Sequence, residues 1–371
     1  MRKPIYFLLL LGALLIGLPM LGTLLVDRPL AYYLEFPPLT IYVQHAGFSW
    51  SAFILLAIVI VLACGPFLLR LITGGSRYHK SIQTQPLPWW GYAAVLMVAV
   101  SWILAWSRFS WFAPLQAYTF FPLWLGYIIT INGLSFRRTG RCLLVSEPRF
   151  LCRLFAASMF FWWFFEYLNR FVQNWYYLGV EDFSAFEYVL HASICFSTVL
   201  PAVLSTEEYL ASFPRLSEPL KDFPPLRLPH PAWIAWPVLF FAAVGLAGIG
   251  RWPDYLFPLL WTAPLLVITA AQRLSGSPTI FAAIEEGDWR PIWLPAMAAL
   301  MCGFFWEMWN YKSLAHWHYS VPYVARFHLF EMPILGYAGY LPFGLECRVV
   351  ANLLQDILDP SEPISHRLRS D

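Results

Sequence analysis

The sequence predicts an all-α, polytopic transmembrane helix bundle of about ten spans, with two parallel four-helix repeats preceded by two helices. Three observations predict it. The 371-residue chain is 59% hydrophobic and 12% charged, whereas a soluble domain is about 25% charged. Apolar stretches near the ~20 residues that a bilayer requires recur along the chain. A Phe-aromatic-Glu-x-x-Asn motif, followed by Trp-x-Tyr, occurs twice.

Hydropathy divides the chain into ten candidate spans. The first follows Arg2 and Lys3 and is too long for the apolar region of a signal peptide, so it is read as a retained transmembrane helix. Pro258, Pro264 and Pro295 interrupt the eighth and ninth spans. In order, the segments are 5–26, 49–72, 89–106, 115–135, 151–172, 187–206, 231–249, 255–273, 291–309 and 329–351.

The distribution of Lys and Arg predicts the orientation. With the N-terminus in the cytoplasm, most of these residues fall in cytoplasmic segments, as the positive-inside rule requires. An even number of spans then leaves both termini cytoplasmic. We expect an integral protein of the plasma (inner) membrane. The formal net charge is only +2 and no basic run is present, so nucleic acid is not an expected partner; the expected partners are membrane lipid and a lipophilic small molecule.

The repeat is read from regular spacings. Glu166 and Glu307 are 141 residues apart, and Trp175 and Trp317 are 142 apart. Spans 3–6 and 7–10 are therefore interpreted as two copies related by an axis along the membrane normal. The predicted divisions are two N-terminal transmembrane helices with an external loop at 1–84, repeat 1 at 85–206, a Pro-rich cytoplasmic linker at 207–230, repeat 2 at 231–355 and a polar cytoplasmic tail at 356–371.

The repeated acid is the first catalytic candidate. Glu307 is expected roughly 20–24 Å up its helix, at 1.5 Å per residue, which places it in the outer leaflet. An ionisable group at that depth is a functional candidate as a general acid or base. Asn310, one turn further on, is expected to orient Glu307. The repeat-1 counterparts Glu166 and Asn169 are read as a scaffold copy, with Arg170 placed to pair with Glu166. A purely structural role for these residues is the competing interpretation.

Repeat 2 adds histidines that repeat 1 lacks. His316 and His318 are catalytic candidates that would assist Glu307, together with Glu331 near the predicted start of the last span; Glu187 is the repeat-1 counterpart of Glu331. Interfacial histidines without a ligand role are the competing interpretation. Cofactors are unknown from the sequence. If a metal ion binds, its candidate ligands are His316, His318, His328, Glu307 and Glu331.

Glu346 is the last catalytic candidate. It is expected deep in the final span, with Arg348 as a neighbour that can pair with it. Pro342 and Gly344 would loosen that helix or simply kink it. Glu207, the counterpart of Glu346, is expected to be solvated at a cytoplasmic helix end.

A short resemblance accompanies these residues. Elements of the membrane-bound carotenoid (lycopene) cyclases are similar to Trp317-His318-Tyr319, Pro342 and Glu346. The resemblance implies an enzyme that uses acids to protonate a polyene. The chain departs from that pattern because it lacks paired acids in Pro-x-Glu-Glu and because its repeats have four spans rather than three.

Three functions remain open from the sequence. The first is a membrane enzyme that acts on a lipid or isoprenoid-like substrate by Glu acid/base chemistry at the outer leaflet. The second is a transporter or proton-coupled carrier, and the third is a structural or assembly protein. A phosphate-binding P-loop, a dinucleotide fingerprint, a His-Glu-x-x-His motif and a Gly-x-Ser-x-Gly motif are all absent from the sequence, which argues against the chemistries that those motifs serve.

Overall fold

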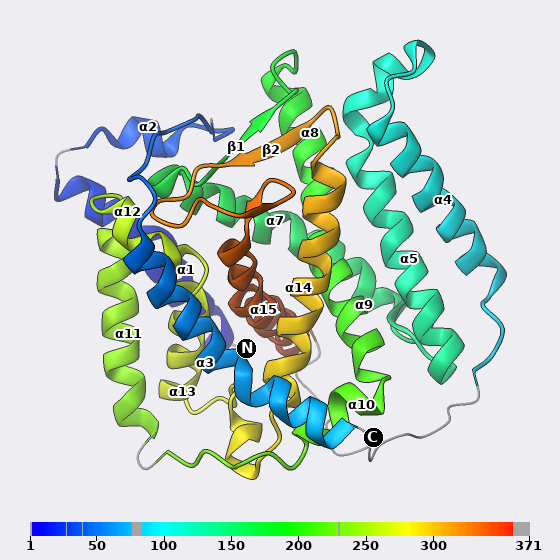
Figure 1. Ribbon diagram of the computed structural model, residues 1–371. Helices are drawn as coiled ribbons and strands as arrows, with labels where there is room; N and C mark the ends of the chain where they lie inside the picture. Colours follow the sequence, from blue (N-terminus) through cyan, green and yellow to red (C-terminus); the bar gives the residue numbers. More distant parts are fainter. Residues whose placement is uncertain (1, 27, 39, 76–83, 229–230, 359–371) are drawn as a thin grey trace.

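The computed structural model describes residues 2–26, 28–38, 40–75, 84–228 and 231–358. Long helices run side by side, and two paired strands cross one end of the bundle (Figure 1). The N-terminal part supplies α1 (Arg2–Leu24), α2 (Leu30–Leu34) and α3 (Trp50–Gly74). Ser49 caps α3, because its hydroxyl accepts the Ala52 amide.

The first predicted repeat is helical except for one strand. Pro148 begins the helix that carries Glu166, and Gln173, with a left-handed backbone, ends it. The elements are α4 (Trp89–Trp106), the 3₁₀ helix η2 (Ser110–Tyr118), α5 (Phe120–Thr139), α6 (Leu143–Ser146), α7 (Pro148–Val172), β1 (Trp175–Leu178), α8 (Ala185–Phe196) and α9 (Val199–Ala211).

The second predicted repeat follows the short helices α10 (Pro214–Ser217) and η3 (Glu218–Leu220), which lie within the Pro-rich linker. The elements are α11 (Pro231–Gly248), α12 (Pro253–Leu256), η4 (Phe257–Leu260), α13 (Ala263–Leu274), η5 (Ala282–Glu286), α14 (Arg290–Asn310), β2 (His316–Tyr319), β3 (His328–Leu329), β4 (Met332–Pro333), η6 (Ile334–Gly339) and α15 (Tyr340–Leu358).

The helices have the length and apolarity of a membrane protein. In the described chain, five helices are long and apolar enough to cross a bilayer, or up to seven if each bent pair counts as one span. The bent pairs are η2 with α5, and α12–η4 with α13. Each of the ten predicted segments contains a helix, but α7 and α15 do not meet the same criteria and α11 is shorter. The described chain is therefore mostly helical, with several apolar helices that fit a multi-pass membrane protein.

The last predicted span begins later than expected. Residues 328–333 form the β3–β4 hairpin, and Phe330 at its turn has a φ of 57°. The 3₁₀ helix η6 follows, and regular α-helix begins only at Tyr340. The prediction that Glu331 lies near a helix N-terminus was therefore wrong: the residue belongs to the hairpin turn.

The core lies where α14 packs against α15 and α9. Figure 1 shows α15 in the middle of the bundle, with α14 and α9 on one side of it. The two helices α14 and α15 approach closely, because a Cβ on Gly344 would lie 2.0 Å from the carbonyl oxygen of Pro295. Gly344 thus serves helix packing in an unbroken α15.

Candidate functional site

The two Trp-x-Tyr motifs meet in one antiparallel pair of strands. β1 pairs with β2 so that Trp175 lies opposite Tyr319 and Tyr177 lies opposite Trp317. The two motifs therefore pair in antiparallel order. This pairing joins the ends of α7 and α14, where Glu166 and Glu307 lie.

Glu166 is fully buried and its carboxylate accepts three side-chain hydrogen bonds. The donors are the indole of Trp162 (2.9 Å), the indole of Trp175 (3.1 Å) and the hydroxyl of Tyr177 (2.6 Å), all to Oε1. Its other oxygen, Oε2, has no partner in the described part of the chain. Arg170, expected to pair with Glu166, instead donates to the carbonyl of Tyr32.

Glu307 occupies the corresponding place in α14, but its partners differ. It is also fully buried, and Oε1 accepts from the hydroxyls of Tyr319 and Tyr340, both at 2.7 Å. The indole of Trp317 donates to the Tyr319 oxygen at 2.8 Å. Oε2 of Glu307 likewise has no partner among the described residues. Glu307 thus has two hydroxyl partners, whereas Glu166 has one hydroxyl and two indoles; a hydroxyl both donates and accepts, whereas an indole only donates.

The pKa of Tyr319, in β2 outside the helices, is raised well above its ordinary value. Burial is the main cause and the nearby Glu307 carboxylate the next. The pKa of Tyr177 is raised well above its ordinary value for the same two reasons, with Glu166 as the carboxylate. Both phenols therefore stay neutral and keep their protons at physiological pH.

The two asparagines hold the strands to the helices. Asn310 donates to the carbonyl of Trp317 (2.7 Å) and accepts from its amide (2.8 Å). Asn169 donates to the carbonyl of Trp175 (2.8 Å) and accepts from the amide of Asn174 (2.8 Å). The amide groups expected to orient the glutamates bind the strand backbone, so they fix the position of each Trp-x-Tyr motif.

A cavity of about 570 Å³ lies beside the strand pair, and its walls are mostly apolar. Both predicted repeats and α3 contribute to it. The lining includes the aromatic partners of both glutamates: Trp162, Trp175, Tyr177, Trp317, Tyr319 and Tyr340. Glu166 and Glu307 are not among the lining residues, so their carboxyl groups lie behind those side chains.

The repeat-2 histidines form a chain at the edge of this cavity. His316 lines the cavity, and its Nε2 lies 3.0 Å from Nε2 of His318. Nδ1 of His318 lies 3.1 Å from Oε2 of Glu331. His328 is exposed in β3, and Glu307 binds tyrosines instead. Among the described residues, no three His, Cys, Asp or Glu side chains gather to hold a metal ion.

The remaining candidates have local structural partners. Glu346 is buried and its Oε1 accepts from the amide of Leu265, in the first turn of α13. Glu187 completes a capping box with Ser184 at the start of α8. Glu207, expected to be solvated, is buried and paired with Arg348, whose Nη2 lies 2.6 Å from Oε2 of Glu207. Arg348 was therefore wrongly assigned to Glu346.

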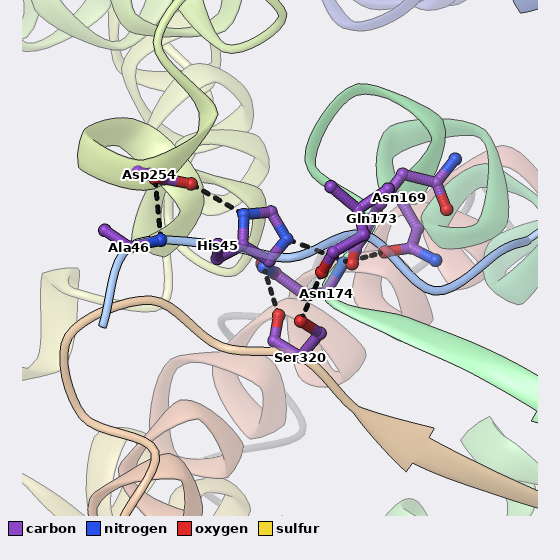
Figure 2. Close-up of polar contacts among 8 residues, drawn as sticks. His45, Ala46, Asn169, Gln173, Asn174, Asp254 and Ser320 are labelled. Atoms are coloured by element: carbon purple, nitrogen blue, oxygen red, sulfur yellow. Dashed lines mark hydrogen bonds and ion pairs between the residues drawn. The ribbon is translucent and has the colours of Figure 1, made fainter. Parts of the chain in front are cut away.

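An extended segment ahead of α3 ties this end of the bundle together. Figure 2 shows His45 between Asp254 and Gln173, with Nδ1 2.6 Å from Oδ1 of Asp254 and Nε2 3.2 Å from the Gln173 carbonyl. Asn174 and Ser320 exchange two hydrogen bonds beneath it. His45 therefore links α12 to the end of α7.

Asp254→Ala is expected to destabilise the protein by about 1–3 kcal/mol, because it leaves a buried histidine and a backbone amide without their acceptor. Asp254 accepts from the Ala46 amide at 3.0 Å as well as contacting His45. Thermal unfolding of the detergent-purified protein measures the effect. Asp182→Ala, at an exposed loop carboxylate, is the control; equal shifts for the two variants would contradict the assignment.

Sequence reasoning missed two partners of the glutamates. Trp162 stands four residues before Glu166 in the same helix, so the i, i+4 spacing was a usable signal. Tyr340 lies 33 residues from Glu307, and no local pattern joins them. The cavity itself has no sequence signal, since it depends on how α3 and both halves of the chain are placed.

Comparison with models of known protein families, with curated proteins and with solved structures finds no match for this chain.

Proposed function

We propose that this protein is a multi-pass membrane enzyme that acts on a lipid or isoprenoid-like substrate held in the cavity beside the β1–β2 pair. The observation that carries the proposal is an apolar cavity of about 570 Å³ that is lined by the hydrogen-bond partners of two buried glutamates. Ligand pockets are commonly about 300–1,000 Å³ and mainly apolar, with few polar groups.

The chemistry proposed is general acid/base catalysis through tyrosine. Tyr319 and Tyr340 line the cavity and donate to Glu307. In this scheme a tyrosine hydroxyl exchanges a proton with the substrate, and Glu307 behind it supplies or accepts the compensating proton. Asn310 holds the strand that carries Tyr319. Tyr319 and Tyr340 are the catalytic residues of this proposal, Glu307 is the group with which they exchange the compensating proton, and Asn310 positions Tyr319.

The proposed membrane placement puts the strand pair at the outer face, both termini in the cytoplasm and the protein in the plasma (inner) membrane. Ten spans and two parallel repeats belong to the same proposal. The reversed pairing of the two Trp-x-Tyr motifs supports the repeats, because an axis along the membrane normal relates two such strands in antiparallel fashion. The packing of α4 on α5 and of α11 on α13 also supports them.

Helix α3 supports a substrate that enters from lipid. None of its residues is buried, yet one stripe of it lines the cavity. The stripe has helical spacing and consists of Leu56, Val59, Ile60, Ala63 and Cys64. Val59 lines the cavity and is 53% exposed, so α3 is the part of the cavity wall that this proposal places beside lipid.

The two other functions have less support. A carrier that uses both acids requires a cavity that reaches Glu307 and Glu346, whereas the lining contains neither and Glu346 is bound to Leu265. A structural role accounts for the hydrogen bonds of Asn169 and Asn310, but it gives no reason for a large apolar cavity beside them.

Val59→Trp is expected to deplete the lipid that co-purifies with the protein, because the indole would occupy the cavity. Val61→Trp is the matched control: it makes the same change on the same helix, at a residue 66% exposed that does not line the cavity. Mass spectrometry of lipid extracted from each purified protein measures the difference. Equal retention of the same lipid species by both variants would overturn the proposed binding site.

A further inference from the structure

Two ring nitrogens at the edge of the cavity face each other. Nε2 of His316 lies 3.0 Å from Nε2 of His318, within hydrogen-bond distance. Their rings are 4.9 Å apart between centroids. Such a contact is stable only if one nitrogen carries a proton or if a cation lies between the two.

The other ring nitrogens decide which protons are present. Nδ1 of His316 lies 2.8 Å from the carbonyl of Leu314, and a carbonyl only accepts, so this Nδ1 bears hydrogen. Nδ1 of His318 lies 3.1 Å from Oε2 of Glu331, and a carboxylate also only accepts. In neutral imidazoles both Nε2 atoms are then lone-pair donors that point at one another.

We propose that His316 and His318 are two ligands of a divalent transition-metal ion of the zinc class, bound at the edge of the cavity. Histidines that bind metals usually donate their second N–H to a carboxylate or a backbone carbonyl, which fixes the ring and its tautomer. Glu331 and the Leu314 carbonyl stand in those two places. A cation between the facing lone pairs converts their repulsion into ligation.

The geometry suits two of four ligands. With Zn–N bonds of about 2.0–2.1 Å, nitrogens separated by roughly 3.3 Å give a tetrahedral angle, and the observed 3.0 Å requires only a small opening of the pair. The remaining positions are left for water or for an oxygen of the cavity ligand, because His316 lines the cavity. A catalytic zinc site has three protein ligands and one open position, whereas the two histidines proposed here would leave two positions open.

An acidic side chain next to the two histidines favours a bound cation. Glu331 contacts His318, and Glu181 is exposed in the loop after β1. Tyr176 lies opposite His318 across the strand pair and stacks on its ring. His191 also lines the cavity but contacts the rings of Tyr118 and Phe183.

The test is metal binding by the full chain in nanodiscs, purified without a polyhistidine tag. Titration with Co²⁺, which gives visible absorption bands in a site of this type, is expected to show about one ion per chain. His316→Gln and His318→Gln are each expected to abolish the bands. Glu331→Gln is expected to weaken binding by about 10–100-fold, as loss of a carboxylate that holds a metal-binding histidine does.

His328→Gln is the matched control, since His328 is exposed in β3 of the same external region, and it is expected to bind Co²⁺ as the wild type does. Thermal unfolding without metal confirms that each variant is folded. Binding no stronger in the wild type than in the His316→Gln/His318→Gln double variant would overturn the proposal and leave a proton between the rings. Because the readout is metal content, its outcome is independent of the lipid substrate.

Discussion

Glu307→Gln is expected to lower turnover of the lipid substrate by about 10²–10⁴-fold, the range that general acid/base groups contribute. Glutamine has the shape of glutamate, and its oxygen can still accept from Tyr319 and Tyr340. The amide cannot take up or release the proton that those hydroxyls exchange with the substrate. The protein should therefore fold and bind lipid but fail to convert it.

Untargeted lipid profiling of cells that express each variant at matched membrane levels measures this effect. Glu166→Gln is the control, because Glu166 is equally buried and also has an unpartnered Oε2 among the described residues. Both substitutions replace a buried carboxylate by an amide of the same shape, so similar thermal shifts are expected with a lipid change in only one. Identical lipid profiles for the wild type and Glu307→Gln would contradict the proposed enzyme function.

How much the sequence could predict depends on the distance between partners along the chain. Glu307, Asn310 and the Trp317–Tyr319 motif lie within one helix end and the strand after it, and the structure brings them together. Because the motif occurs twice at nearly constant spacing, the sequence also pointed to both glutamates. The pairing of the two motifs into one sheet required the three-dimensional structure, since 142 residues separate Trp175 from Trp317.

Helical geometry explains one wrong pairing. Arg348 and Glu346 are two residues apart in α15, and residues at that spacing point to different sides of a helix. Glu346 therefore reaches α13 while Arg348 reaches Glu207 in α9. The periodicity of 3.6 residues was sufficient to exclude the predicted pair, but nothing in the sequence identified Glu207 as the actual partner.

Hydropathy failed at the last span for a different reason. The β3–β4 hairpin and η6 are as apolar as the helix that follows them, and averaging over a window cannot separate them. Phe330 with its left-handed backbone and Pro333 in β4 mark the irregular region. This region places Glu331 beside His318 instead of at a helix start.

Arg348→Met is expected to destabilise the protein by about 3–5 kcal/mol, since it leaves a carboxylate buried without its partner. Glu207 and Arg348 form a two-point contact, with Nε of Arg348 at 3.0 and 2.9 Å from the two carboxylate oxygens. Their side chains are 10% and 26% exposed, so the effect should fall at the lower end of that range. Denaturant unfolding in mild detergent measures it.

The double variant Glu207→Met/Arg348→Met should be more stable than Arg348→Met alone, because it removes the unpaired charge as well as the ion pair. Arg290→Met, which breaks the contact with Asp288 only two residues away, is the control; its side chains are 27% and 25% exposed, and about 0–1 kcal/mol is expected. Recovery in the double variant would show that the cost arises from desolvation of Glu207. A double variant less stable than Arg348→Met would instead mean that the carboxylate has another stabilising role, and the pair would no longer explain how α9 and α15 are held together.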